Sequence, residues 1–225
     1  MSYTGLGVYQ QPKKPNRRPL WIVLAVVAVL AVAGGATAAV LIGSKSTQAA
    51  TTSAEPPKPE WPLIEDEQAG VAYEVPPSWE DSVGGASGRV RLSKSLVSRP
   101  FECQGRDMIQ AQIASGAVIE ADLAGVATTL ATDFANNSYT VEGKRPRLAE
   151  PDVRGDEERT VVSVGVTPSA VNPCYAPKAT VTVVALRDGP KAAVVVLNVA
   201  EGGPHVAEGP SEDEADRILE SVRLR

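Results

Sequence analysis

The stretch ATVTVVALRDGPKAAVVVLNVA, residues 179–200, decides the fold of this chain. Two runs rich in valine, residues 179–187 and 191–200, flank the tripeptide Asp-Gly-Pro at 188–190. β-Branched residues favour strands, and an Asp-Gly pair between two such runs is a strong turn signal. The stretch therefore predicts two neighbouring antiparallel strands.

Four more segments carry strand patterns. Val71, Tyr73 and Val75 alternate with other residues, which is typical of a half-buried strand. The glycines of residues 84–88 predict a turn into a partner strand, so the first two segments are interpreted as a hairpin. Residues 98–118 hold only isolated apolar residues, and their structure is left open. The four segments are residues 71–75, 89–93, 139–148 and 159–167.

Two segments carry the pattern of amphipathic helices. In the first, apolar residues recur at i, i+3, i+4, i+7, i+8 and i+11 from Leu123 on one helix face, and Asn136 suits its end. The second spans residues 212–222, where Ser211 and Glu214 predict a capping box. The order of these elements predicts an α+β domain with a largely antiparallel β-sheet of about six strands covered by helices.

An uninterrupted apolar run precedes this domain. Residues 20–42 contain no charged side chain, and a helix that spans a bilayer needs about 20 residues. The run therefore predicts one transmembrane helix. Only Lys45 follows it closely, whereas four basic residues precede it, and this asymmetry predicts a cytoplasmic amino terminus and an extracytoplasmic carboxyl-terminal domain. The four are Lys13, Lys14, Arg17 and Arg18.

A cleaved secretory signal is the alternative to a permanent anchor. Ala36, Thr37 and Ala38 imitate the small-x-small cleavage site of such a signal. The apolar run continues beyond them to Ile42, however, and exceeds the roughly 7 to 15 apolar residues of a signal peptide. A permanent single-pass anchor in the cell membrane is therefore the favoured interpretation.

Composition divides the chain into four parts. Residues 1–19 have too few aliphatic residues for a core and predict a disordered, basic cytoplasmic tail. The predicted transmembrane helix at 20–42 is followed by residues 43–60, a linker rich in Pro, Ser and Thr that predicts an extended spacer. Residues 61–225 are long enough for one folded extracytoplasmic α+β domain with its own core.

The charge of the chain excludes one class of partner. Of its 22 basic residues four precede residue 19, which leaves 18 basic against 27 acidic residues, a net charge of −9. Binding to nucleic-acid phosphates needs clustered Lys and Arg side chains. A nucleic-acid partner is therefore not expected.

The chain has two cysteines, Cys103 and Cys174, both on the side predicted to be extracytoplasmic. Oxidising conditions let disulfides persist there, so a Cys103–Cys174 disulfide is favoured, and two separate buried thiols are the alternative. A metal site is not expected, since His205 is the only histidine and neither cysteine belongs to a Cys-x-x-Cys pair. No catalytic or cofactor-binding residue is predicted.

The stretch GVAYEVPPSW, residues 70–79, resembles the opening of small extracytoplasmic domains in actinobacterial envelope proteins. Those proteins share the tail, single span, spacer and two-cysteine domain, and a final Ile-Leu-x-Ser-Val helix, here residues 218–222. Most are domains of unknown function. The resemblance implies a fold similar to the α/β/α sandwich of the photosystem II subunit PsbP and of mycobacterial LpqN-type lipoproteins, which it associates with protein binding. It implies no catalytic or ligand residue.

This architecture favours a non-catalytic interaction module of the cell envelope, with an envelope protein or a small ligand as its partner. A small-molecule or lipid-binding protein is the alternative, and an apolar cleft between sheet and helix, lined by Trp79, Phe134 or Tyr139, would support it. Ordinary core positions are the expectation for these aromatic residues.

An enzyme is not expected. A catalytic histidine belongs in a structured pocket, whereas His205 follows Gly-Gly-Pro in a predicted loop. An envelope hydrolase would need paired acids, and neighbouring acids such as Glu65 with Asp66 or Glu157 with Glu158 are usually solubilising. A hydrolase is therefore the least favoured of the functions considered.

Overall fold

The computed structural model describes residues 60–170 and 173–225. The predicted tail at 1–19, the predicted transmembrane helix at 20–42 and residues 43–59 of the predicted linker lie outside the described residues. Within the described part, no helix is both long and apolar enough to cross a membrane.

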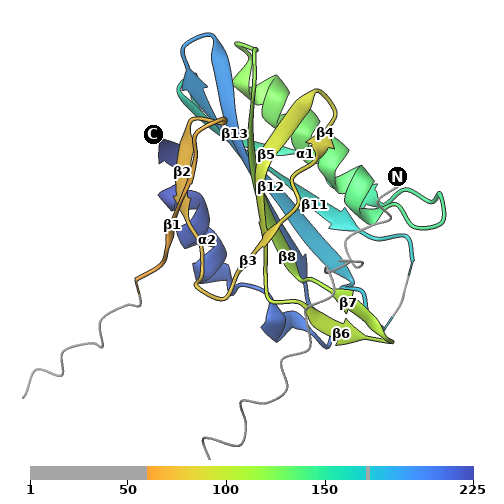
Figure 1. The fold of residues 1–225 in the computed structure, drawn as a ribbon. Coiled ribbons are helices and arrows are strands. Elements are labelled where there is room, and N and C mark those ends of the chain that lie inside the picture. Colours follow the sequence, from red (N-terminus) through yellow and green to blue (C-terminus); the bar gives the residue numbers. More distant parts are fainter. Residues whose placement is uncertain (1–59, 171–172) are drawn as a thin grey trace, which may run out of the picture. The chain divides into compact units, whose positions relative to one another are not determined.

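An antiparallel sheet of nine strands forms the main layer of the domain (Figure 1). Its strands are β3 (Glu80–Ser82), β4 (Ala86–Ser87), β5 (Val90–Val97), β8 (Ala111–Val118), β9 (Arg147–Leu148), β10 (Asp152–Gly155), β11 (Arg159–Thr167), β12 (Lys178–Asp188) and β13 (Lys191–Glu201). Seven of them follow the order β10-β11-β12-β13-β8-β5-β3, while β4 pairs with β5 and β9 with β11. The predicted antiparallel α+β class is confirmed, but the sheet has nine strands rather than about six.

The two valine-rich runs form the longest pair of this sheet. β12 and β13 pair without interruption from Lys178 with Glu201 to Asp188 with Lys191. Gly189 takes a φ of +59° in the turn between them, a conformation that glycine adopts without steric cost. The predicted antiparallel pair is confirmed.

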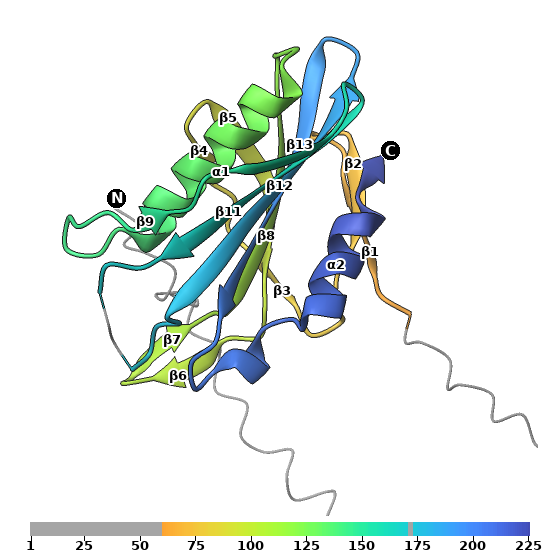
Figure 2. The same cartoon turned by 180° about the vertical axis from the view of Figure 1, so that it is seen from behind.

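The helix α1 (Leu123–Tyr139) packs against the valines on one face of the sheet (Figure 2). Asp122 caps its start, because the Asp122 carboxylate accepts a hydrogen bond of 2.9 Å from the Gly125 N–H. The predicted helix is confirmed, but it continues past Asn136. The reason is that Tyr139 extends the buried stripe, and its hydroxyl donates a 2.9 Å hydrogen bond to Asn198 Oδ1.

A second helix and a small sheet pack against part of the opposite face. They are α2 (Glu212–Ser221) and the antiparallel strands β1 (Leu63–Asp66), β2 (Val71–Glu74) and β14 (Arg223–Leu224). Tyr73 and Ile218 are fully buried there against Val195 of the large sheet. Ser211 and Glu214 form the predicted capping box, which is confirmed.

A second hairpin lies beside the large sheet. It consists of β6 (Phe101–Cys103) and β7 (Arg106–Met108). A disulfide joins Cys103 to Cys174, the pairing that the sequence favoured, and so ties this hairpin to the segment before β12. The ring of His205, just before the 3-10 helix η1 (Val206–Glu208), stacks on Phe101 with 4.1 Å between ring centroids.

Residues 139–148, predicted as a strand, do not form one. Tyr139 closes α1, and only Arg147–Leu148 pair with the large sheet as β9. Between them, Glu142 and Gly143 have φ values of +50° and +78°. Positive φ is incompatible with a strand, so the chain turns here instead of extending.

The predicted hairpin of residues 71–75 with 89–93 is also wrong. β2 pairs with β1 and β14 in the small sheet, while β5 pairs with β4 across Gly88. Residues 98–118, left without an assignment, contain β6, β7 and β8. β8 lies inside the large sheet between β13 and β5.

The burial of Tyr73 predicts a loss of stability at alkaline pH. Burial raises the pKa of the Tyr73 phenol from 10.0 to about 12; the hydrogen bond with Ser115 opposes this rise, and nearby Asp66 and Asp81 add to it. In the unfolded chain the Tyr73 phenol ionises near pH 10. The unfolded chain therefore binds fewer protons at Tyr73 than the folded chain between pH 10 and 12. The contribution of Tyr73 to the free energy of unfolding should therefore be complete below about pH 10. It should fall by roughly 3 kcal/mol by about pH 12.

Urea unfolding of the wild type and Tyr73→Phe between pH 8 and 12 checks this expectation. The variant should show a smaller fall in the free energy of unfolding above pH 10, because phenylalanine cannot ionise. Buried Tyr139, whose pKa burial also raises, should account for part of the remaining fall. An equally steep fall in the variant would contradict the role of Tyr73.

Candidate functional site

The aromatic residues proposed for a lipid or small-molecule cleft lie in the core. Phe134 and Tyr139 are buried between α1 and the sheet, and Trp79 packs against the core of the opposite face. None of them lines the groove at β9, β11, β12 and β13 or the cavity at the start of α1.

The candidate titratable residues do not converge on one site. His205 stacks on Phe101, Asp66 is buried in a hydrogen-bond network with serines, and Glu158 pairs with Arg187. In residues 60–170 and 173–225, no group of three or more His, Cys, Asp or Glu side chains is arranged to hold a metal ion.

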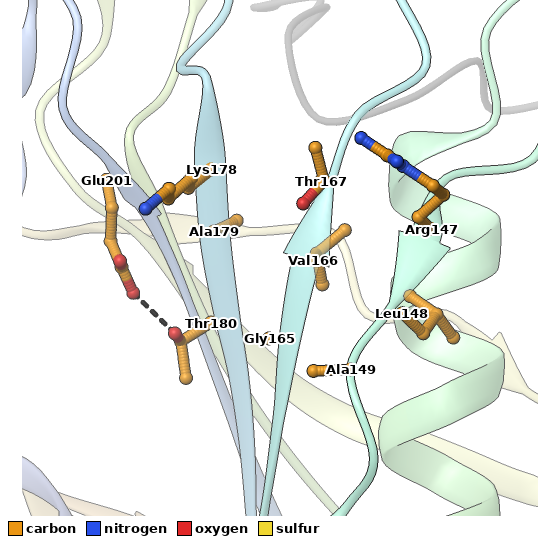
Figure 3. A pocket seen from close by; sticks show the side chains of 10 residues that line it. All are labelled: Arg147, Leu148, Ala149, Gly165, Val166, Thr167, Lys178, Ala179, Thr180 and Glu201. Atoms are coloured by element: carbon orange, nitrogen blue, oxygen red, sulfur yellow. Dashed lines mark hydrogen bonds between the residues drawn. The ribbon is translucent and has the colours of Figure 1, made fainter.

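A groove of about 380 Å³ opens on the large sheet where β9, β11, β12 and β13 lie next to one another (Figure 3). We call it the Gly165 groove. Its polar lining and floor come from Arg147, Gly165, Thr167, Lys178, Thr180 and Glu201.

Strand register places these residues on one face. Thr167 lies opposite Arg147, Gly165 opposite Thr180, and Lys178 opposite Glu201. Residues directly opposite each other, and residues two apart in a strand, project from the same side of a sheet. This side is the one on which α2 and the small sheet pack further along the strands, but Thr167 and Thr180 are only half-buried.

Gly165 keeps the floor of the groove open. A Cβ atom added at this position would lie 3.4 Å from the Cβ of Ala149 and would meet no other atom within 4 Å. A side chain at residue 165 would therefore enter the groove at its Cβ without striking the backbone.

The rim of the groove is basic. Arg147 and Lys178 are exposed, and neither forms an ion pair with a residue that the structure describes. The carboxylate of Glu201 accepts a hydrogen bond from the Thr180 hydroxyl within the groove (Figure 3). The groove thus offers hydroxyl groups and two cations without an ionic partner among the described residues, a set that binds anions and hydrogen-bond acceptors.

A second cavity, of about 520 Å³, lies at the start of α1. Its main cation, Arg187, donates hydrogen bonds to the carbonyls of Glu157 and Ala121 at 2.7 and 3.1 Å. Arg154 pairs with Asp152. Because these charges are already compensated, the Gly165 groove is the stronger candidate.

Sequence reasoning missed this groove. The strand at 159–167 alternates valines with Ser163, Gly165 and Thr167, and this pattern does indicate a polar, solvent-facing side. The pattern does not tell which strands lie beside that face, so Arg147, Lys178 and Thr180 could not be joined to it.

Comparison with known proteins gives a family and several remote structural likenesses. The family model described as a domain of unknown function (DUF8017) matches residues 54–225. No curated protein matches the chain.

The chain is similar to the Ran-binding protein Mog1p of Saccharomyces cerevisiae at 14% identity and a TM-score of 0.44, over 73% of this chain and 95% of that chain. It is also similar to the cyanobacterial PsbP protein of Synechocystis at 12% identity and a TM-score of 0.47, over 78% of this chain and 99% of that chain. Likenesses at these scores carry no argument about function.

Proposed function

Because the chain belongs to the DUF8017 family, a family of domains of unknown function, we propose its role from the surface of its own domain. The chain is a non-catalytic binding module of the cell envelope, and one amino-terminal span holds it in the cell membrane. Its extracytoplasmic domain binds an envelope protein in the Gly165 groove.

The observation that supports this role is the groove itself. It is an open hollow with a glycine floor, and its rim carries Arg147 and Lys178, which have no ionic partner among the described residues. The histidine of the chain, His205, is stacked on Phe101 and does not line this groove. Cations without a described ionic partner, beside hydroxyl donors, suit the recognition of an anionic or hydrogen-bond-accepting partner.

The anchor at residues 20–42 and the spacer at 43–60 support an envelope location. Protease added to intact spheroplasts that carry the full-length chain should remove a carboxyl-terminal tag while a cytoplasmic marker stays intact. A tag that resists protease until the membrane is dissolved would contradict the proposed topology.

Site-specific photo-crosslinking in cells tests binding at the groove. A photoreactive amino acid replaces Thr167 in the full-length chain, and Thr129 on the exposed side of α1 is the matched control position. The expected result is a discrete protein adduct at residue 167 and none at residue 129. The same adducts at both positions, or none at either, would contradict a protein-binding groove.

Filling the groove is expected to abolish this adduct while the domain stays folded. Gly165→Val places a β-branched residue in a strand, where it is favoured, and its Cβ meets only Ala149. The free energy of unfolding should change by less than about 1 kcal/mol. Thr129→Val is the control, since it adds the same side chain on α1. An adduct that persists in Gly165→Val would place the partner elsewhere.

A small anionic ligand is the second candidate, and the size of the groove favours it. A volume of about 380 Å³ falls within the roughly 300 to 1,000 Å³ of small-molecule sites. If no protein adduct forms, native mass spectrometry of the purified full-length chain should show a bound small molecule that Gly165→Val loses.

A further inference from the structure

We infer that the Gly165 groove binds an extended acidic segment of its partner protein. This inference rests on the proposed function and names the chemistry that the groove selects. It has three supports: the basic rim, the length of the groove, and the carboxylate that already accepts a hydrogen bond from one hydroxyl of the groove.

The basic rim is longer than the two cations that line the groove. Lys144 and Arg145 are exposed in the same segment as Arg147, and no acidic residue lies between Glu142 and Glu150. The Lys144 carbonyl accepts a 3.1 Å hydrogen bond from the Ser169 hydroxyl, which fixes this segment beside the end of β11. Four basic residues, Lys144, Arg145, Arg147 and Lys178, thus lie in β9, just before it or at the start of β12, whereas Glu201 is the one acid among the described residues of the groove lining. Such a concentration of basic residues attracts anionic partners.

The groove has the length of a peptide segment. Its lining crosses four neighbouring strands, from Arg147 on β9 through Thr167 on β11 and Thr180 on β12 to Glu201 on β13. At the usual spacing between strands this path is about 14 Å long. An extended peptide of about four residues covers this distance, whereas one carboxylate or one phosphate does not.

Glu201 already shows that a hydroxyl of the groove donates to a carboxylate. Its carboxylate receives the hydrogen bond of the Thr180 hydroxyl. An incoming acidic side chain competes with Glu201 for this hydroxyl and is repelled by its charge. Removal of the charge at residue 201 should therefore strengthen the binding of an acidic segment, whereas removal of the charges at 147 and 178 should weaken it.

Fluorescence anisotropy with defined peptides tests these opposite expected changes in affinity. The full-length chain in a neutral detergent is titrated into a labelled (Glu-Thr)4 peptide and, separately, a labelled (Lys-Thr)4 peptide. The acidic peptide should bind and the basic one should not, and binding should weaken as the salt concentration rises from about 50 to about 300 mM.

Three variants separate the effect of charges in the groove on peptide binding from the effect of the net charge of the chain. Arg147→Glu with Lys178→Glu should weaken binding of the acidic peptide about tenfold or more, and Glu201→Gln should strengthen it about twofold to fivefold. The control is Arg91→Glu with Lys191→Glu, which changes net charge equally at the opposite end of the strands and should have an effect of less than about twofold.

Several outcomes would overturn the inference. They are tighter binding of the basic peptide, no binding of the acidic peptide, weaker binding in Glu201→Gln, or an equal loss in both charge-reversed variants. Free glutamate that competes as well as the peptide would reduce the ligand to a small anion and would also overturn it. If the acidic peptide fails but the cellular adduct at residue 167 is still lost in Gly165→Val, the proposed function stands and only the acidic chemistry fails.

Discussion

Replacement of both Cys103 and Cys174 by serine is expected to lower the free energy of unfolding by about 4 kcal/mol. The disulfide spans a sequence separation of 71 residues. A crosslink over so long a loop removes much of the conformational entropy of the unfolded chain. For a domain of this size the melting temperature should fall by roughly 8 to 16 °C.

In the double serine variant, the region around the disulfide should unfold locally before the rest of the domain. Cys103 lies in the two-stranded sheet of β6 and β7, and a hairpin of two strands is only marginally stable by itself. Hydrogen exchange in the double serine variant should therefore rise most in residues 101–108. β12 and β13 should keep their protection, because their valines are buried on both faces of the sheet.

A reducing agent provides the matched control for this prediction. Circular dichroism melting of the full-length chain should show that reduction lowers the melting temperature of the wild type to that of the double serine variant. The variant itself should not respond. A wild type that melts at the same temperature before and after complete reduction would mean that the crosslink does not limit unfolding.

The elements that the sequence predicted well are those whose signals are local. The capping box of α2 lies within residues 211–214, the turn of the valine hairpin lies at residues 188–190, and the stripe of α1 repeats within one helix. Each signal is complete within a few turns or strands, so no tertiary contact is needed to read it.

The strand β8 could not be predicted because tertiary contacts, rather than local sequence preference, determine its conformation. Its sequence AQIASGAV is rich in small residues of weak strand preference. The small side chains fit because neighbouring strands and the small sheet pack closely around them. At Gly116 an added Cβ would clash with the carbonyl oxygen of Arg91 on β5. Such a close approach is visible only once β5 and β8 are known to be neighbours.

The Gly165 groove depends on a register that sequence patterns do not specify. Arg147 meets Thr167 only because residues 139–146 turn instead of continuing a strand. Lys178 and Glu201 become neighbours through the pairing of β12 with β13. The sequence predicted these two strands only over residues 179–187 and 191–200, so both residues lie one position beyond the predicted pair, and the part of the site on β9 also required the fold.

Replacement of Asp66 by alanine is expected to destabilise the domain by about 3 to 5 kcal/mol. Asp66 is 4% exposed, and its Oδ2 accepts hydrogen bonds of 2.6 Å from the hydroxyls of both Ser93 and Ser115. Its Oδ1 accepts the N–H groups of Gln68 and Ala69, each at 3.1 Å. The carboxylate thus joins the turn after β1 to β5 and β8.

The expected cost comes from the donors that alanine would leave behind. Hydrogen bonds to a charged group contribute about 1.5 to 3 kcal/mol each, and buried donors without a partner add their desolvation penalty. Ser115 is fully buried and would keep only the Tyr73 hydroxyl, 3.3 Å away, as a side-chain partner. The small sheet would then lose its polar connection to the large one at this point.

Urea unfolding of three variants measures this effect. Asp66→Asn keeps the shape and can satisfy the serines if their hydroxyls rotate to accept, so it should cost less than Asp66→Ala. The neighbouring Glu65→Ala is the control, since Glu65 is half-exposed and pairs with Arg225 at the surface; it should cost less than about 1 kcal/mol. Equal losses in Asp66→Ala and Glu65→Ala would show that the serine network does not hold the two sheets together. A loss in Asp66→Asn as large as in Asp66→Ala would show that the negative charge, rather than the shape of the acceptor, is what the serines require.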